Sequence, residues 1–245
     1  MGVKSHIPNT ITLLNLVFGC IAISMIVQGN VEQGAKFILL SLVMDFLDGL
    51  SARTLNAYSE TGKQLDSLAD LVSFGVAPAM ILHIFIVQDL WLRNETGAVA
   101  RFLPYLPFIL PVFSAIRLAR FNIDTEQTTF FKGLPTPASA IVVISLPYIR
   151  TSHDSILAAP AGDTWFLILV SIVLSYLMVS NIRFFSLKFR STSWKDNRPQ
   201  YLLILFSVAM FMVLGISSVP LIIVLYLLLS LVFKSEPSTP EQTDT

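Results

Sequence analysis

The sequence is short of charged residues. Asp, Glu, Lys and Arg make up 13% of its 245 residues, whereas soluble domains carry about 25%. It has one cysteine, Cys20, so an intramolecular disulfide is excluded. It also lacks any long basic run that could neutralise a phosphate backbone, and we therefore expect no nucleic-acid partner.

Long uncharged stretches take the place of the missing charge. Residues 7–27 contain no Asp, Glu, Lys or Arg, and a helix of that length, at about 1.5 Å per residue, crosses a hydrocarbon core of about 30 Å. A cleaved signal peptide does not explain this run, because it is too long, has no small-residue cleavage site and is followed by further apolar runs. The same criterion predicts eight helical spans, at residues 7–28, 35–55, 65–88, 102–119, 134–150, 164–183, 200–215 and 218–234.

We expect an all-α integral membrane protein. Six of the predicted spans fall in residues 1–198, a transmembrane hairpin occupies residues 199–234, and residues 235–245 form a disordered tail. The uncharged run at the hairpin is too long for one span, and Gly215 and Pro220 favour a turn in its middle. One long tilted helix is the alternative, and it would place the tail on the other side of the membrane.

The cationic residues of the loops predict the orientation. If the N-terminus is cytoplasmic, four Lys and Arg residues lie outside and the other twelve of the sixteen lie inside. Lys and Arg resist translocation, so this asymmetry favours both termini on the cytoplasmic side. The four outer cations are Lys36, Arg93, Arg101 and Arg150.

Four aspartates interrupt the second and third predicted spans. They form the pattern D-x2-D-G-x2-A-R-x8-G-x3-D-x3-D, whose acidic positions are Asp45, Asp48, Asp66 and Asp70. An ionised carboxylate in hydrocarbon costs several kcal/mol unless it is compensated. Capping of helix ends or pairing with Arg at the membrane edge would explain any one of these residues, but it does not explain four at this spacing.

The spacing of the aspartates predicts one shared cleft. Residues three or four apart lie on one helix face, and the short loop between Arg53 and Gly62 makes the two helices antiparallel neighbours. Both pairs of carboxylates can then point into a cleft near the cytoplasmic surface. The two cations of the motif, Arg53 and Lys63, offset half of the negative charge, and one or two divalent cations would balance the rest through hard oxygen ligands.

This arrangement predicts metal-dependent phosphate transfer to an alcohol. Two metal ions bridged by carboxylates can clamp a diphosphate, while a carboxylate not committed to metal accepts the proton of the alcohol. Gly49 and Ala52 leave room for a nucleotide beside the backbone, and Arg53 can bind phosphate oxygens through its planar fork. An ion-coupled transporter is the alternative from another class. It predicts helices broken at the midplane and repeat symmetry, and the sequence indicates neither.

The complete motif resembles that of the CDP-alcohol phosphatidyltransferase family, and every fixed position is matched. The resemblance extends over about residues 5–185 and implies a six-helix core, usually dimeric, that releases CMP from a CDP-linked lipid or alcohol. It implies that Asp45, Asp48 and Asp66 bind Mg²⁺ or Mn²⁺, and that Asp70 shares a metal and acts as the base. It also implies a CDP pocket formed by Asp48, Gly49, Ala52, Arg53, Gly62 and Asp66.

Four further segments are similar to the bacterial and archaeal phosphatidylserine synthases. This similarity implies transfer of the phosphatidyl group from CDP-diacylglycerol to L-serine, among membrane lipids, at the cytoplasmic face of a bacterial or archaeal membrane. The segments are Pro8-Asn9 with Thr12 to Asn15, Leu71 to Pro78, Arg117 to Asn122, and Phe131 to Pro137.

Three cations are candidates for binding the acceptor. Arg117, Arg120 and Lys132 are predicted on the same side of the membrane as the motif, where a guanidinium or ammonium could bind the carboxylate of serine. Each is explained equally well as a positively charged anchor on the cytoplasmic side. A sister enzyme that uses glycerol phosphate or inositol phosphate is the alternative function, and a phosphorylated acceptor would need more cations than a carboxylate.

Overall fold

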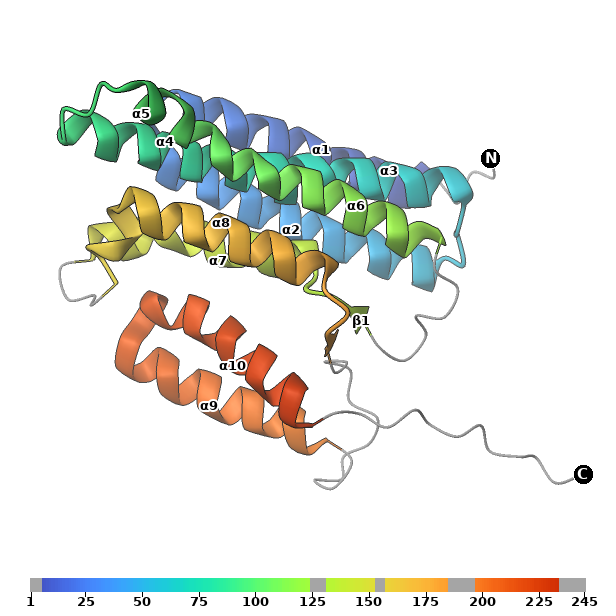
Figure 1. Ribbon diagram of the computed structural model, residues 1–245. Helices are drawn as coiled ribbons and strands as arrows, with labels where there is room; N and C mark the ends of the chain where they lie inside the picture. Colours follow the sequence, from blue (N-terminus) through green and yellow to red (C-terminus); the bar gives the residue numbers. More distant parts are fainter. Residues whose placement is uncertain (1–5, 124–130, 153–156, 185–196, 234–245) are drawn as a thin grey trace, which may run out of the picture.

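The computed structural model describes residues 6–123, 131–152, 157–184 and 197–233, and this part of the chain is almost entirely helical (Figure 1). Each predicted span overlaps a helical segment, although the span predicted at residues 164–183 is helical only as far as Val179. The predicted tail at residues 235–245 lies outside the described residues, and the domain limits stay predictions. The elements are α1 (His6–Val27), α2 (Val31–Thr54), α3 (Glu60–Asp70), η2 (Leu71–Val76), α4 (Ala77–Leu92), α5 (Ala98–Phe102), η3 (Leu103–Phe108), α6 (Ile109–Ile123), β1 (Phe131–Lys132), α7 (Thr136–Thr151), η4 (Pro160–Gly162), α8 (Thr164–Val179), β2 (Arg183–Phe184), α9 (Arg198–Leu214), η5 (Gly215–Ser217) and α10 (Ser218–Val232).

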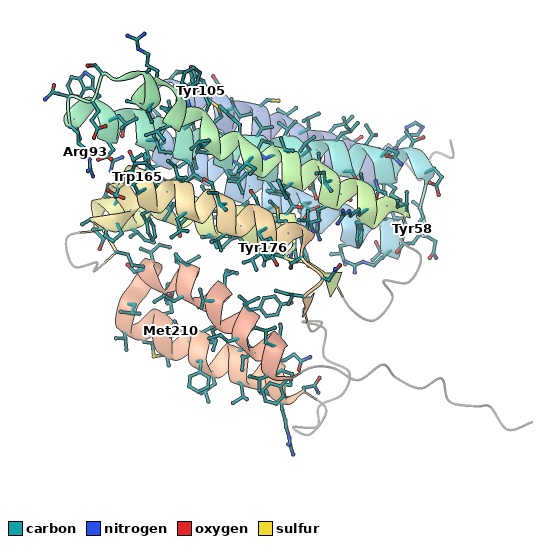
Figure 2. All side chains as sticks on the ribbon, viewed as in Figure 1. Tyr58, Arg93, Tyr105, Trp165, Tyr176 and Met210 are labelled. Atoms are coloured by element: carbon teal, nitrogen blue, oxygen red, sulfur yellow. The ribbon has the colours of Figure 1, made fainter. Side chains whose placement is uncertain are left out.

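Four helical stretches are long and apolar enough to cross a membrane, namely residues 6–27, 60–92, 98–123 and 198–232, and α8 is a shorter apolar helix. Large apolar side chains also cover the outside of the bundle (Figure 2), as expected where lipid is the solvent; Trp165 and Tyr176 of α8 are 64% and 66% exposed. The α2 helix is long enough to span but carries Asp45 and Asp48. An all-α membrane protein is thus confirmed, while the number of crossings stays a prediction.

Successive long helices alternate in direction, and this alternation gathers distant segments at one end of the bundle. The start of α1, the end of α2, the start of α3, the end of α6 and the start of α7 all lie at that end (Figure 1). The four cations predicted to lie outside belong to loops or helix ends at the opposite end of the bundle. The acidic motif therefore sits at the end of the bundle opposite the four cations that are predicted to lie outside.

Small residues let α1 approach its neighbours closely. A Cβ added to Gly19 would collide with Ser73 of η2, and one added to Gly34 of α2 would collide with Ile26. The carbonyl oxygen of Asn15 accepts hydrogen bonds from Ser41 Oγ of α2 and from Ser73 Oγ, both at 3.1 Å. Close backbone approach and buried hydroxyl hydrogen bonds are the usual means of packing helices in membranes.

The helix that carries Asp66 and Asp70 changes its winding immediately after Asp70. Leu71–Val76 forms a π-helical turn before α4 continues the same rod. Such turns are rare and occur frequently at functional sites. Within it Ser73 faces α1, while a Cβ on Gly75 would lie 3.2 Å from the side chain of Ser114 in α6. The turn thus directs two small residues toward two different helices directly beside the acidic cluster.

The segment that enters α7 is held against the end of α8. β1 pairs with β2, and the next two residues continue the contact, because Gly133 N donates to Ile182 O at 3.0 Å and Leu134 N to Leu177 O at 2.9 Å. Gly133 has φ +78°, and a Cβ there would collide with the carbonyl of Met178. Only glycine fits this position, which explains the Gly of the Phe131–Pro137 segment.

The C-terminal helices form a hairpin. Gly215, with φ +54°, ends α9, and η5 leads directly into α10, which runs back beside α9 (Figure 1). Tyr226 and Ser230 of α10 are buried, and α10 contacts α7 and β2. The structure therefore contains the predicted turn in place of the single tilted helix.

Replacing Gly133 with alanine should destabilise the protein. A left-handed conformation costs an ordinary residue about 1–2 kcal/mol, which corresponds to a fall of at least roughly 2–8 °C in the unfolding temperature of a chain of this size. Thermal unfolding in detergent measures this shift. Gly97→Ala is the matched control, since Gly97 has φ −61° and nothing lies within 4 Å of its added Cβ. Equal unfolding temperatures for the two variants would contradict the prediction.

Candidate functional site

The acidic motif folds at the end of the bundle where α2 stops and α3 begins. Residues 55–59 return the chain, and the end of α2 and the start of α3 both lie at this end of the bundle, where each helix packs against α1. Carboxylate oxygens of Asp45, Asp48 and Asp66 all lie within 4.8 Å of one another. Acids from two helices meet in one place, as the spacing of the motif predicts.

The first helix supplies hydrogen-bond donors to these acids. Thr12 Oγ1 donates to Asp48 Oδ2 at 2.6 Å, and Asn15 Nδ2 donates to Asp70 Oδ1 at 3.3 Å. Thr12 and Asn15 are 3% and 0% exposed, so both contacts are sheltered from water. Because the two donors lie three residues apart, they share one face of α1 and fix one carboxylate on each of the two acidic helices.

The cluster has the composition of a site for a hard divalent cation. Among the described residues, Lys and Arg form ion pairs only with Asp89 and Asp163, at the opposite end of the bundle. Asp66 Oδ1 is buried and has no hydrogen-bond partner in the described part of the chain. Three close carboxylates without a cation, one with an orphaned buried oxygen, are unfavourable unless a dication binds them. The residues present therefore fit a metal.

Asp70 lies beside the three-carboxylate set and is not a member of it. It is 7% exposed, near enough to Asp45 and Asp66 for their charges to interact, and held by the amide of Asn15. It lies one helical turn beyond Asp66, at the end of α3. Three carboxylates thus form one close group, and Asp70 lies next to it with Asn15 as its hydrogen-bond partner.

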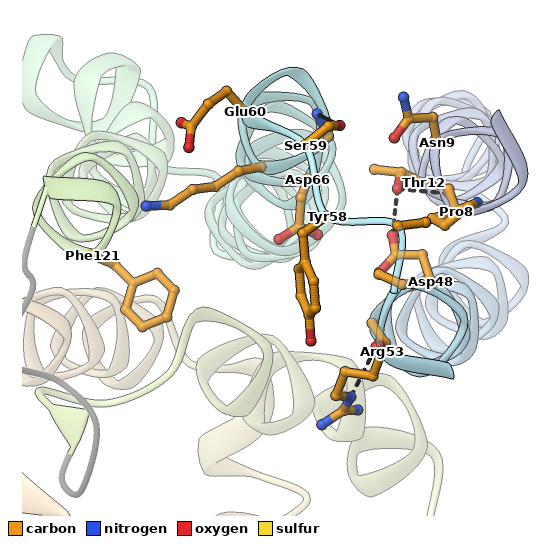
Figure 3. Close-up of a pocket in the computed structure, with 15 residues that line it drawn as sticks. Pro8, Asn9, Thr12, Asp48, Arg53, Tyr58, Ser59, Glu60, Asp66 and Phe121 are labelled. Carbon is orange, nitrogen blue, oxygen red and sulfur yellow. Dashed lines mark hydrogen bonds between the residues drawn. The ribbon is translucent and has the colours of Figure 1, made fainter. Parts of the chain in front are cut away.

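A cavity of about 740 Å³ opens beside the cluster (Figure 3). Its lining includes Asp48 and Asp66, and Figure 3 shows Thr12 beside Asp48, joined by their hydrogen bond. Every residue that the resemblance assigns to the CDP pocket lines this one cavity. The full lining is Pro8, Asn9, Thr12, Asp48, Gly49, Ala52, Arg53, Ala57, Tyr58, Ser59, Glu60, Gly62, Lys63, Asp66 and Phe121.

The two glycines of the motif have different surroundings. A Cβ on Gly49 would meet only Arg53, at 3.9 Å, so this position leaves open space beside the backbone. A Cβ on Gly62 would lie 2.8 Å from Asn9 Oδ1 and 2.9 Å from Ser59 Oγ. Gly62 N also donates to Ser59 Oγ, the N-cap of α3, at 3.0 Å. Gly62 therefore lets α3 start close against α1, a packing role that its place in the motif does not reveal.

Arg53 is exposed at the mouth of the cavity. Its Nε donates to the carbonyl of Gly49 at 2.9 Å, one turn earlier in α2. It has no carboxylate partner within the described ranges, which leaves its other nitrogens free for an anion. This is the arrangement expected of a phosphate-binding guanidinium.

The structure separates the three predicted acceptor cations. Arg117 is half-buried in α6 and donates from Nη1 to Thr136 Oγ1 at 2.9 Å. Arg120, three residues later, is exposed. For Lys132 only the backbone is described, as part of β1, so its side chain lies outside the described structure.

Several side chains of the site are not among the site residues predicted from the sequence. Thr12 and Asn15 bond the acids, while Tyr58 and Phe121 line the cavity. A signal for α1 was present, because Asn9, Thr12 and Asn15 recur every third residue in an otherwise apolar run. Polar residues at that spacing mark one polar face of a membrane helix. Tyr58 lies between α2 and α3, where no local pattern identifies it, and Phe121 belongs to the Arg117–Asn122 segment, whose similarity to the synthases assigns it no individual role.

Comparison with known proteins agrees with this geometry. The sequence model of the CDP-alcohol phosphatidyltransferase family matches residues 5–177. The chain is 34% identical over 184 residues to the CDP-diacylglycerol–serine O-phosphatidyltransferase of Bacillus subtilis, covering 74% of this chain and 90% of that protein. It is 31% identical over 228 residues to the protein of the same name from Helicobacter pylori (strain 26695), covering 92% of this chain and 89% of that one.

An archaeal protein is similar as well. The archaetidylserine synthase of Methanothermobacter thermautotrophicus is 29% identical over 180 residues, which cover 73% of this chain and 69% of that protein. The family match contains the whole acidic motif and the α1 residues that bond to it. The chain belongs to the CDP-alcohol phosphatidyltransferase family.

Proposed function

We propose that this protein transfers the phosphatidyl group of CDP-diacylglycerol to the hydroxyl of L-serine, giving phosphatidylserine and CMP. The observation that carries the proposal is the carboxylate cluster beside a cavity lined by every residue that the family motif assigns to CDP. The names of the bacterial relatives favour serine over glycerol phosphate or inositol phosphate as the acceptor.

The residues of the site have distinct roles in this proposal. Asp45, Asp48 and Asp66 would hold Mg²⁺ or Mn²⁺, and the hydrogen bond from Thr12 orients Asp48. A bound dication supplies charge neutralisation for the diphosphate. The CDP moiety occupies the cavity, where Gly49 and Ala52 leave space beside the backbone and Arg53 donates to phosphate oxygens.

Asp70 is the proposed base. The serine hydroxyl oxygen forms a bond to the lipid-side phosphorus, and the bond from that phosphorus to the bridging oxygen breaks. The electron pair leaves with CMP, and Asp70 accepts the hydroxyl proton. Its hydrogen bond from Asn15 and its place outside the three-carboxylate set support this role, because a base must keep an oxygen free of metal.

We further propose that the site faces the cytoplasm of a bacterial or archaeal cell and that the chain is a homodimer surrounded by membrane lipids. The charge asymmetry of the loops supports this orientation, since the four outer cations belong to the end of the bundle opposite the acids. CDP-diacylglycerol would enter from the membrane, with its nucleotide in the cavity and its acyl chains among the apolar helix faces.

Purified protein supplied with CDP-diacylglycerol and labelled serine should form labelled phosphatidylserine only when Mg²⁺ or Mn²⁺ is present. Chelation should abolish the product, and restoring the ion should recover it, because the carboxylate cluster cannot neutralise a diphosphate by itself. Thin-layer chromatography of the lipid fraction measures the product. Product from glycerol phosphate or inositol phosphate in place of serine would assign the chain to a sister activity.

Asp70→Asn should lower turnover by at least about 10²-fold, the range typical of general bases, and leave CDP-diacylglycerol binding largely intact. Single-turnover CMP release and binding of labelled CDP-diacylglycerol measure the two properties. Glu95→Gln is the matched control, since Glu95 is an exposed carboxylate at the other end of the bundle. Wild-type turnover in Asp70→Asn would remove Asp70 from the proposed role.

Thr12→Val should raise the Mn²⁺ concentration needed for half-maximal activity by about 10-fold or more. Residues that orient a metal ligand typically contribute 10–100-fold to metal affinity or activity. Thr12→Ser keeps the hydroxyl that donates to Asp48 and should stay near the wild-type value. A Mn²⁺ titration of the three proteins separates the outcomes, and equal dependence for the Val and Ser variants would show that the hydrogen bond does not support the metal.

A further inference from the structure

A second cavity lies at the end of the bundle opposite the acids. It has a volume of about 550 Å³ and is bounded by the start of α2, by α4 and by the end of α7. This volume is within the range of about 300–1,000 Å³ that is typical of pockets for small ligands. The proposed reaction does not use this cavity, because the acids and the cavity assigned to CDP lie at the other end.

Arg150 of α7 is fixed in the second cavity with part of its guanidinium unused. The guanidinium lies 4.6 Å from the ring centre of Phe85, and its Nη1 donates to Gln88 Oε1 at 2.8 Å. Both partners are neutral, and the described chain places no carboxylate within ion-pair distance of Arg150. These contacts with α4 hold the planar group in place. A guanidinium fixed in this way is suited to binding a phosphate through two parallel hydrogen bonds.

The other cations at this end of the bundle have different surroundings. Arg93 forms ion pairs with Asp89 and Asp163 at 3.0 and 2.7 Å. Lys36 and Arg101 are exposed, and neither of them lines the second cavity. The cation that the second cavity offers to a ligand is therefore the one on α7.

The second cavity also contains an acid. Glu32, in the first turn of α2, is exposed and lines the cavity together with Arg150. The hydroxyl of Tyr148 donates to the backbone carbonyl of Glu32 at 3.1 Å and so joins α7 to α2 beside the cavity. Glu32 and Arg150 are the charged side chains among the described residues of the lining, and their charges balance. A ligand with one negative and one positive group matches them.

Aromatic side chains mark the level of the second cavity in the membrane. Trp91, Tyr105 and Trp165 are 77%, 60% and 64% exposed at the same end of the bundle, where Figure 2 labels the last two. Exposed Trp and Tyr residues of membrane proteins gather at the level of the lipid headgroups. A ligand in the second cavity is therefore placed among headgroups.

We infer that the second cavity binds the headgroup of a zwitterionic membrane phospholipid, with its phosphate on Arg150 and its ammonium group on Glu32. Phosphatidylethanolamine is a simple phospholipid of this chemistry. Basic pockets between membrane helices bind lipid headgroups, and the acid in this one disfavours a headgroup that carries negative charge alone. The inference does not depend on the proposed function, because none of the proposed catalytic or metal-binding residues lines the second cavity.

The test adds phospholipids with identical acyl chains to lipid-depleted protein in detergent. Phosphatidylethanolamine should raise the unfolding temperature at a lower concentration than phosphatidylglycerol, which has the phosphate but no ammonium group. Arg150→Gln should weaken the binding of phosphatidylethanolamine by at least about 10-fold, the loss expected for charge-assisted hydrogen bonds. Arg101→Gln, which changes an exposed cation at the same end but outside the cavity, is the matched control and should bind as wild type does.

Glu32→Gln tests the acid separately, and it keeps the inference testable if Arg150→Gln does not fold. Because Glu32 is exposed, this variant should fold, and it should lose the preference for phosphatidylethanolamine over phosphatidylglycerol. Equal binding of the two lipids by wild type, or unchanged binding in either variant, would overturn the inference. Equal stabilisation by water-soluble glycerophosphoethanolamine would also overturn it, since the cavity would then be a site for a free solute.

Discussion

The structure depends on holding like charges together in a place where water is scarce. Asp45, Asp48 and Asp66 approach within 4.8 Å at the end of a helical bundle, and Lys and Arg do not neutralise them within the described residues. Such a cluster is unfavourable by itself and becomes favourable when a dication binds. The packing of α2 and α3 against α1 stabilises this arrangement of carboxylates, which is unfavourable until a metal binds.

The first helix is as important to the site as the two acidic helices. Its backbone at Asn15 accepts two serine hydroxyls from neighbouring elements, its side chains bond two of the acids, and Gly19 allows the close contact with η2. One polar face of an otherwise apolar helix therefore both joins the bundle and sets the geometry of the carboxylates. The π-helical turn after Asp70 belongs to this junction, because it directs Ser73 toward α1.

The C-terminal hairpin stands apart from the acidic site. Outside the hairpin itself, its described contacts are with α7 and with β2, and none of its residues lines the cavity. The similarity to the Helicobacter pylori protein covers 92% of the chain and thus extends into the hairpin. The hairpin contacts α7, and Thr136, the first residue of α7, accepts a hydrogen bond from Arg117.

By itself, the sequence determined the all-α membrane class, the positions of the helices and the meeting of acids from α2 and α3, because apolar length and helical spacing are local properties. The tertiary structure alone decided that Asp70 lies beside the close group of the other three acids, that Thr12 bonds Asp48 and Asn15 bonds Asp70, and that Gly62 serves close packing. It also separated Arg117 from Arg120, which look equivalent in sequence, because burial depends on which neighbouring helix each side chain meets. Contacts between residues far apart in the chain have no local signature, and they carry the chemistry of this site.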